Sequence, residues 1–333
     1  MKNLRVGVLR GGPNKEYEIS LQSGAAVLKN LPYGTTGVDI FIGRDGMWHV
    51  GGIPVKEGDA LSRVDVVWNA LHGVYGEDGT VQRILETFGI PYTGSEPHAS
   101  FLGMNKERAK LELVDAGFRM PRHSIFRTRE DTAHEAAQSI FSHVAPPWII
   151  KPIAGGSSVG IVIARTFPEL VSTLQALALA EDSESAYIVE EMIRGKEATV
   201  GILDDFRGED IYALPPVEIR PPTGSVFWDY DAKYSGKSEE ICPGNFSRTE
   251  KEALTEAAKV IHKRLGLRHY SRSDFIVSAN DKVYFLEVNT LPGLTQESLF
   301  PKALDAVGAS IPYFIEHVLK QALTKKVRGG MPL

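Results

Sequence analysis

Two strand-forming runs near the C-terminal end constrain the fold more than any other part of the chain. Residues 270–277 and 283–289 are rich in β-branched and aromatic residues, and the polar run 278–282 lies between them. This pattern predicts a β-hairpin. Because side chains alternate between the two faces of a strand, Arg272 and Asp274 share one face of the first strand, and Glu287 and Asn289 share one face of the second.

The predicted hairpin brings two acids and an amide together. A turn centred between residues 280 and 281 places Asp274 opposite Glu287 and Arg272 opposite Asn289. Side chains in such cross-strand pairs lie about 4.5–5.5 Å apart at Cβ. Three oxygen ligands and one guanidinium would then converge on one patch of sheet.

Two facing carboxylates repel one another unless a cation lies between them. Two carboxylates and an amide are hard oxygen ligands, which suit Mg²⁺ shared with nucleotide phosphates. The alternative is a surface hairpin with solvated charges. The apolar surroundings favour the metal, because acids that face inward without a partner are costly.

Composition limits the remaining classes. A chain of 333 residues is long enough for two or three domains, and its net charge of −5 argues against a nucleic-acid partner. The single cysteine, Cys242, excludes an internal disulfide framework and a thiolate-rich metal site. We find no signal segment and no apolar run of membrane-spanning length, so we expect a cytoplasmic protein without a membrane partner.

The first hundred residues predict an α/β unit with a doubly wound parallel sheet. Residues 4–9 form a buried strand pattern that ends at a glycine turn, and a helix pattern with Glu16 at its start follows. The turn lacks the G-x-G-x-x-G dinucleotide motif. Glu16 could stabilise the helix by a favourable interaction with the helix dipole, or it could bind the ammonium group of a ligand. His72 follows the strand 64–69 in a glycine-rich loop, at the sheet edge where such folds bind ligands.

A second glycine-rich loop, residues 155–160, follows the strand that carries Lys151. It could be an ordinary glycine hairpin or a phosphate-binding loop, although the Walker A motif is absent. Lys151 lies on the strand just before the loop, and its positive charge favours the phosphate-binding interpretation. The strands 187–193 and 197–203 are joined by a short linker, which would suit a hinge around an adenine ring.

The motifs of the chain are individually weak but occur in a specific order. They are Gly11-Gly12 with Glu16 and Ser20, Leu71-His72-Gly73, Gly76–Thr80, Pro91–Ser95, Lys151-Pro152, Gly156–Gly160, Asp229–Tyr234, Glu287–Thr290 and Pro292-Gly293. In this order they resemble the D-alanine–D-alanine ligases of the ATP-grasp superfamily over nearly the whole chain. The resemblance implies a homodimer and an α/β fold, α+β in its ATP-grasp part. It implies three domains: 1–103, 104–190 and 191–333.

The resemblance also implies a nucleotide and metal site. The implied roles are Lys106 and Lys151 on the α- and β-phosphates, Ser157 and Ser158 in the phosphate loop, Glu190, Glu191 and Ile193 around adenine, Glu197 on ribose, and Lys233 on the γ-phosphate. Asp274, Glu287 and Asn289 would hold two Mg²⁺ ions, with Mn²⁺ as a substitute.

For the substrates, the resemblance implies a second set of residues. Glu16 and His72 would bind the first D-alanine, Ser157 and Tyr234 would close the site with Glu16, Arg272 and Gly293 would stabilise the oxyanion, and Ser298 with Leu299 would bind the second D-alanine. The implied reaction joins two D-alanines through an acyl phosphate for peptidoglycan synthesis. Glu297 departs from the family pattern, which leaves D-lactate or D-serine as alternative second substrates. A nucleotide-binding scaffold without turnover is the alternative outside enzymes.

Overall fold

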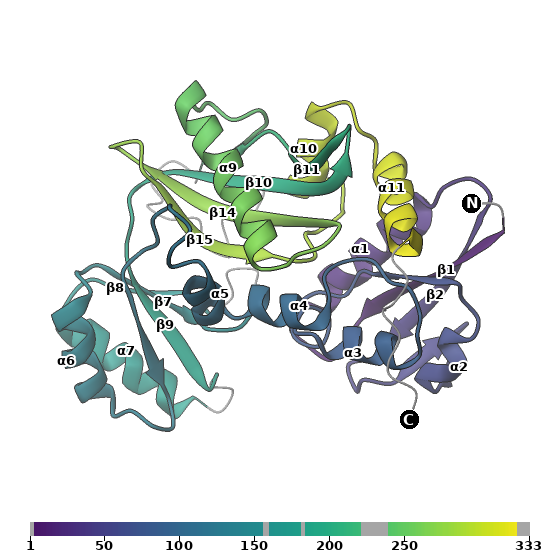
Figure 1. Cartoon of the computed structure of the whole chain (residues 1–333). Helices are drawn as coiled ribbons and strands as arrows, with labels where there is room; N and C mark the ends of the chain where they lie inside the picture. The colour runs from purple at the N-terminus through teal and green to yellow at the C-terminus, as the bar shows by residue number, and fades with distance from the viewer. Residues whose placement is uncertain (1–2, 156–159, 181–183, 221–238, 325–333) are drawn as a thin grey trace.

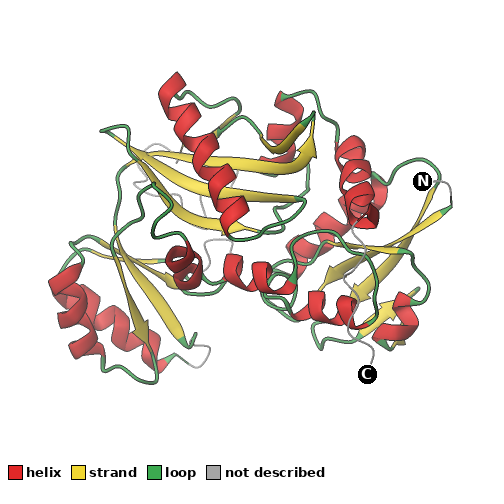
Figure 2. Ribbon diagram, viewed as in Figure 1, coloured by secondary structure: helices red, strands yellow, loops and turns green. Residues whose placement is uncertain are grey.

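Three β-sheets, each covered by helices, form the structure (Figures 1 and 2). The computed structural model describes residues 3–155, 160–180, 184–220 and 239–324. Within these ranges, none of the helices combines the length and the apolar character needed to cross a membrane.

The N-terminal sheet has the strand order β4-β3-β2-β1-β5. Its strands are β1 (Leu4–Gly11), β2 (Thr35–Ile42), β3 (Trp48–Val50), β4 (Ile53–Val55) and β5 (Val66–Asn69). β1 pairs in parallel with β2 and β5, and β1 and β5 are largely buried, as expected for strands covered on both faces. β3 and β4 pair antiparallel, so the predicted parallel sheet carries an antiparallel edge.

Four helices accompany this sheet: α1 (Tyr17–Lys29), α2 (Glu57–Leu61), α3 (Thr80–Thr87) and α4 (Pro97–Met104). After α3 the chain returns to the sheet only through an isolated parallel bridge between Val67 and Tyr92. The sequence analysis missed α4, which begins at a proline in its first turn.

The central sheet is antiparallel, with the order β6-β9-β7-β8. Its elements are α5 (Lys106–Glu112), β6 (His123–Arg127), α6 (Ala133–His143), β7 (Trp148–Pro152), β8 (Val162–Ala164), α7 (Phe167–Leu179) and β9 (Ala186–Glu191). Figure 1 shows α6 and α7 packed together beside this sheet, at the end of the molecule away from the N-terminal sheet.

The large sheet has the order β13-β12-β10-β14-β15, with β11 paired to β10. Its strands are β10 (Gly195–Phe206), β11 (Glu209–Ala213), β12 (Val217–Arg220), β13 (Glu239–Ile241), β14 (Tyr270–Ser278) and β15 (Val283–Asn289). The helices are α9 (Arg248–Arg264), α10 (Leu299–Ala306) and α11 (Ile311–Thr324). α9 starts at a capping box made by Ser247 and Glu250 and crosses one face of the sheet (Figure 1).

The β14–β15 hairpin has the predicted register at its polar end. Asp274 pairs with Glu287, which confirms the prediction. Toward the turn, however, Phe275 pairs with Phe285 and not with Leu286. A β-bulge between these pairs adds one residue to β15 and offsets a turn that is centred on Asn280 and not between residues 280 and 281. The bulge therefore restores the predicted facing of Asp274 and Glu287 although the turn centre differs from the predicted one.

Candidate active site

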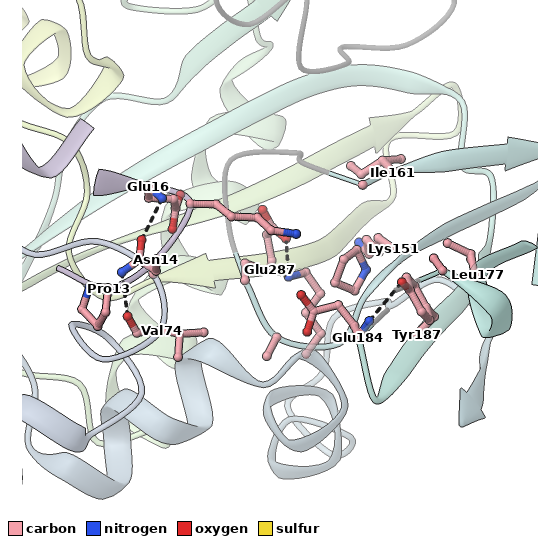
Figure 3. Close-up of a pocket in the computed structure, with 18 residues that line it drawn as sticks. Pro13, Asn14, Glu16, Val74, Lys151, Ile161, Leu177, Glu184, Tyr187 and Glu287 are labelled. Atoms are coloured by element: carbon pink, nitrogen blue, oxygen red, sulfur yellow. Dashed lines mark hydrogen bonds and ion pairs between the residues drawn. The ribbon is translucent and has the colours of Figure 1, made fainter. Parts of the chain in front are cut away.

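The three sheets meet at a cavity of about 450 Å³, which we call the main cavity (Figure 3). Glu16 borders it from the N-terminal unit, Lys106 from the start of α5, Lys151 from β7 and Glu287 from β15. Residues from distant parts of the sequence thus form one concave surface with charges of both signs.

A narrower space of about 70 Å³, which we call the inter-sheet slot, opens between the central sheet and the large sheet. It shares Lys151, Ile161 and Glu287 with the main cavity. Its walls include apolar side chains and five acids: Ile149, Ile161, Ile193, Ile276, Leu286, Glu190, Glu191, Glu197, Asp274 and Glu287. A slot with apolar side chains in its walls that leads to lysines can take the aromatic base of a nucleotide, with the phosphates toward the cations.

Lys106 lies between the central sheet and the hairpin. The Asn105 side chain accepts a hydrogen bond from the backbone of Arg108, which caps α5 and fixes the position of its first residue. The Lys106 ammonium donates to the Gly155 carbonyl at 2.6 Å and lies 3.3 Å from Glu287 Oε2. A cation between the Gly155 carbonyl and an acid is well placed for a phosphate group.

Glu190 is buried between two lysines. Lys151 Nζ lies 2.8 Å from Glu190 Oε2, and Lys110 Nζ lies 2.9 Å from Glu190 Oε1. Burial opposes ionisation, but the two ammonium groups outweigh it and lower the pKa of Glu190 to about 2. The sequence analysis missed Lys110, although its spacing of four residues from Lys106 places both on one face of α5.

The polar end of the hairpin holds the predicted oxygen donors. Arg272, which pairs with Asn289 across the strands, donates two hydrogen bonds of 3.0 Å to Asp274. Thr199 on β10 donates a third bond to Asp274, at 2.5 Å. Asn289 Oδ1 accepts the Leu291 N–H at 2.9 Å, which leaves it one further lone pair.

The oxygen atoms of Asp274, Glu287 and Asn289 are suitable ligands for a hard divalent cation. Asp274 and Glu287 face each other, and Arg272 and Lys106 now compensate their charges. Among the described residues no group of three or more His, Cys, Asp or Glu side chains could hold a metal ion. The set here comprises two carboxylates and an amide oxygen, and the remaining ligands of a Mg²⁺ ion are usually water and substrate phosphates.

Glu16 stands at the start of α1, and Asn14 positions it. The Asn14 side chain accepts a hydrogen bond from the Glu16 N–H at 2.7 Å and donates to the carbonyls of His72 and Val74 (Figure 3). Gly73 has φ +70°, and a Cβ there would lie 2.5 Å from Glu16 Oε2, so this approach requires glycine. Asn14 is a second residue that the sequence analysis missed.

His72 is buried behind Glu16, with its Nε2 2.7 Å from Ser23 Oγ. Burial lowers the pKa of His72 more than the nearby Glu16 raises it, so the imidazole is neutral at pH 7. A neutral ring beside Glu16 can accept or donate a hydrogen bond without repelling a substrate ammonium.

Glu77 links the loop after β5 to the loop after β15. Its carboxyl group accepts hydrogen bonds from the N–H of Gly73 at 2.8 Å, the N–H of Leu291 at 3.0 Å and the hydroxyl of Thr290 at 3.2 Å. Burial, with the nearby Glu16 charge second, raises the pKa of Glu77 to about 8. This third missed residue was hidden in a glycine-rich motif that we interpreted only as a loop.

Gly293 and Ser298 lie close together after the hairpin. A Cβ on Gly293 would lie 2.9 Å from Ser298 Oγ, so a side chain here would displace the serine. Ser298 precedes α10, and the Leu299 side chain is buried in the core. Glu297 is 90% exposed and lies 3.8 Å from Lys302, so its carboxylate faces solvent.

Only some of the predicted site residues line the two cavities. They include Glu16, Lys106, Lys151, Glu190, Glu191, Ile193, Glu197, Asp274 and Glu287. His72, Arg272, Asn289, Gly293, Ser298 and Leu299 line neither cavity. The predicted residues Ser157, Ser158, Lys233 and Tyr234 lie outside the described residues.

Comparisons with known proteins place this geometry in a family. Residues 113–320 match the family described as D-ala D-ala ligase C-terminus, and residues 51–95 match the D-ala D-ala ligase N-terminus. A D-alanine–D-alanine ligase from Geobacter sulfurreducens is 40% identical over 332 residues, which are 99% of this chain and 97% of the relative.

Solved structures give the same result. The D-alanine–D-alanine ligase from Bacillus anthracis complexed with ATP is 29% identical, with a TM-score of 0.78 over 96% of this chain and 97% of the other. The VanG D-Ala:D-Ser ligase from Enterococcus faecalis is 29% identical, with a TM-score of 0.81 over 96% of this chain and all of the other. The fold, the charged cleft and these matches together show that the chain belongs to the D-alanine–D-alanine ligase family.

Proposed function

We propose that this protein joins two D-alanine molecules to D-alanyl-D-alanine with ATP, through an acyl phosphate, for peptidoglycan synthesis. One observation carries the proposal: in a chain of this family, the main cavity and the inter-sheet slot share Lys151 and Glu287. A nucleotide in the slot would present its phosphates to the same cavity that Glu16 borders.

The reaction needs charge neutralisation and positioning. A carboxylate is a poor electrophile, and transfer of the γ-phosphoryl group gives it a leaving group. The amine of the second D-alanine then attacks the acyl carbonyl, loses a proton, and phosphate departs. No protein nucleophile is required.

Each predicted residue has a place in this scheme. Lys106 and Lys151 would neutralise phosphate charge, and Glu190, Glu191, Ile193 and Glu197 would surround the base and ribose. Lys233, with Ser157 and Ser158, would contact the phosphates.

The substrates would bind between the N-terminal unit and the hairpin. Glu16 would hold the ammonium of the first D-alanine beside the neutral His72. Arg272 and the backbone of Gly293 would stabilise the oxyanion. Ser298, with Leu299 beside it, would form the pocket for the carboxylate of the second D-alanine, and Ser157 and Tyr234 would close the site.

Asp274, Glu287 and Asn289 would hold two Mg²⁺ ions, or Mn²⁺ in their place. When bound, these ions would neutralise phosphate charge. We further propose a homodimer in the cytoplasm, and three domains at residues 1–103, 104–190 and 191–333.

The test is phosphate release from ATP with D-alanine, L-alanine and D-lactate in turn, followed by the mass of the product. D-alanine should stimulate release and give the dipeptide. If D-alanine stimulates no release in the presence of Mg²⁺, the proposal fails.

The similarity to a D-Ala:D-Ser ligase supports D-serine as a second candidate acceptor. Glu297 is exposed and lines neither cavity, so Glu297→Gln should leave the preference between D-alanine and D-serine unchanged. A mixed product containing D-serine from the unaltered protein would favour this second candidate.

A further inference from the structure

Lys110 is a buried cation that contacts neither cavity directly. Its side chain is 1% exposed and lies on α5, one turn after Lys106. Its ammonium group lies 5.7 Å from the centre of the Phe285 ring and 2.9 Å from Glu190 Oε1. Burial lowers the pKa of Lys110, so the position is costly for a charge. Packing alone does not explain a buried lysine at this position, because an apolar side chain would fill the same space without the cost of a charge.

The Glu190 carboxylate has two cations, one on each oxygen. Lys151, on Oε2, also lines the main cavity and the inter-sheet slot, whereas Lys110, on Oε1, lines neither. The side of Glu190 that faces the slot and the side that faces the protein interior are therefore compensated separately.

This arrangement matters when Lys151 contacts a nucleotide phosphate. A phosphate draws Lys151 away from Glu190, and a buried carboxylate without a cation is strongly destabilising. With Lys110 in place, Glu190 keeps one ion pair while Lys151 binds phosphate.

We infer that Lys110 is a positioning residue for the nucleotide: it compensates Glu190 and so leaves Lys151 available to phosphate. The inference rests on the proposed function, in which Lys151 contacts a phosphate group. Lys106 cannot substitute for Lys110, because its ammonium group is held by the Gly155 carbonyl and lies beside Glu287.

The experiment measures binding of a non-hydrolysable ATP analogue with Mg²⁺ by calorimetry, on the full-length protein. Lys110→Met keeps the side-chain length and removes the charge. We expect the Kd of the analogue and the KM for ATP to rise at least about tenfold, because Lys151 must then serve Glu190 alone. We expect kcat and the KM for D-alanine to change less than about threefold.

Two further variants separate this role from packing. Lys259→Met removes a lysine from a surface ion pair with Glu209 and should leave the Kd unchanged. In a Glu190→Gln background there is no carboxylate to compensate, so adding Lys110→Met should change the Kd less than about twofold. This comparison also applies if Lys110→Met alone does not fold.

Equal loss of nucleotide affinity in both backgrounds would overturn the inference, as would an unchanged Kd in a folded Lys110→Met protein. An unaltered protein that neither binds the analogue nor releases phosphate would instead refute the proposed function. The two failures are therefore distinguishable.

Discussion

The large sheet meets its two neighbours in different ways. Toward the N-terminal sheet, one continuous core joins the two, and Trp68 of β5 packs against Tyr270 of β14 and Phe314 of α11, with ring centroids 6.1 and 5.8 Å apart. Figure 1 shows α11 beside the N-terminal sheet. Toward the central sheet lie the inter-sheet slot and the ion pair between Lys106 and Glu287 of β15. The ion pairs of Lys110 and Lys151 with Glu190 of β9 lie beside them, within the central unit.

Hydrogen bonds reinforce the same contrast. The Arg268 side chain donates to the carbonyls of Gly94 and Tyr92, and His269 Nδ1 accepts the Gly94 N–H. The apolar cluster of the central sheet, by comparison, draws its buried members from residues 126–189, although Ala109 of α5 and the following Leu113 join a core of the large sheet. The interface between the large sheet and the N-terminal sheet, which we call the fused interface, is therefore a shared core that contributes stability. The interface between the large sheet and the central sheet, which we call the charged interface, leaves space for a ligand between charged walls.

The largest expected effect is at the charged interface. Glu287→Gln removes a carboxylate from both cavities and the partner of Lys106. D-alanine-dependent phosphate release should fall by about 10²–10³-fold, with little change in thermal stability. The matched variant Glu209→Gln, on β11, should retain full activity. Loss of folding without a specific loss of activity would contradict the contrast.

The fused interface should respond in the opposite way. Trp68→Ala leaves a cavity in the shared core, and the free energy of unfolding should fall by about 3–5 kcal/mol. Urea unfolding measures this loss. Nucleotide affinity of the folded protein should change little, because Trp68 lines neither cavity. A large loss of nucleotide affinity at unchanged stability would contradict this prediction, because it would show that this interface serves binding and not stability.

A smaller loss of stability is expected at the polar part of this interface. Arg268→Met leaves the buried carbonyls without their donor, and unfolding free energy should fall by about 1–3 kcal/mol. Arg248→Met is the matched control, since Arg248 is 92% exposed. Its effect should stay within about 0.5 kcal/mol. Equal effects of the two variants would show that the Arg268 contacts do not join the units.

Glu77 gives the fused interface a pH dependence. Its pKa is raised from the ordinary glutamate value to about 8, so between these values the folded protein binds more protons than the unfolded chain. The stability that this group contributes is therefore fully present when the pH is below the ordinary glutamate pKa, and it is lost as the pH rises to about 8. The slope is at most about 1.4 kcal/mol per pH unit. Unfolding from pH 5 to 8 measures it.

In Glu77→Gln this slope should become flatter, because the amide does not titrate, and one hydrogen bond to the loop should be lost. Glu256→Gln, at an exposed position on α9, should keep the slope of the unaltered protein. A slope that persists in Glu77→Gln would assign the pH dependence to another group.

Local patterns in the sequence predicted the first strand and the helix after it, several strands of the central and large sheets, and the facing of Asp274 and Glu287. Period and turn chemistry determine these features over short distances. The bulge at Leu286 was not predictable, because it depends on how β15 packs against the rest of the large sheet. The antiparallel edge of the N-terminal sheet was missed for a similar reason.

The missed residues show where sequence reasoning stops. Lys110, Asn14 and Glu77 act on segments that are distant in the chain or on backbone groups, so no local motif marks them. The burial of Lys110 on the short helix α5 depends on Glu190 of β9, which is 80 residues away in the chain, so it could not be predicted from the local sequence. The roles of the site residues stay predictions until a ligand is bound.

The most direct test of this account is a crystal structure with a non-hydrolysable ATP analogue and Mg²⁺. We predict the base in the inter-sheet slot between Ile149 and Leu286, with the phosphates near Lys106 and Lys151. A nucleotide bound at the fused interface, or at the edge of the N-terminal sheet with the slot empty, would contradict the account.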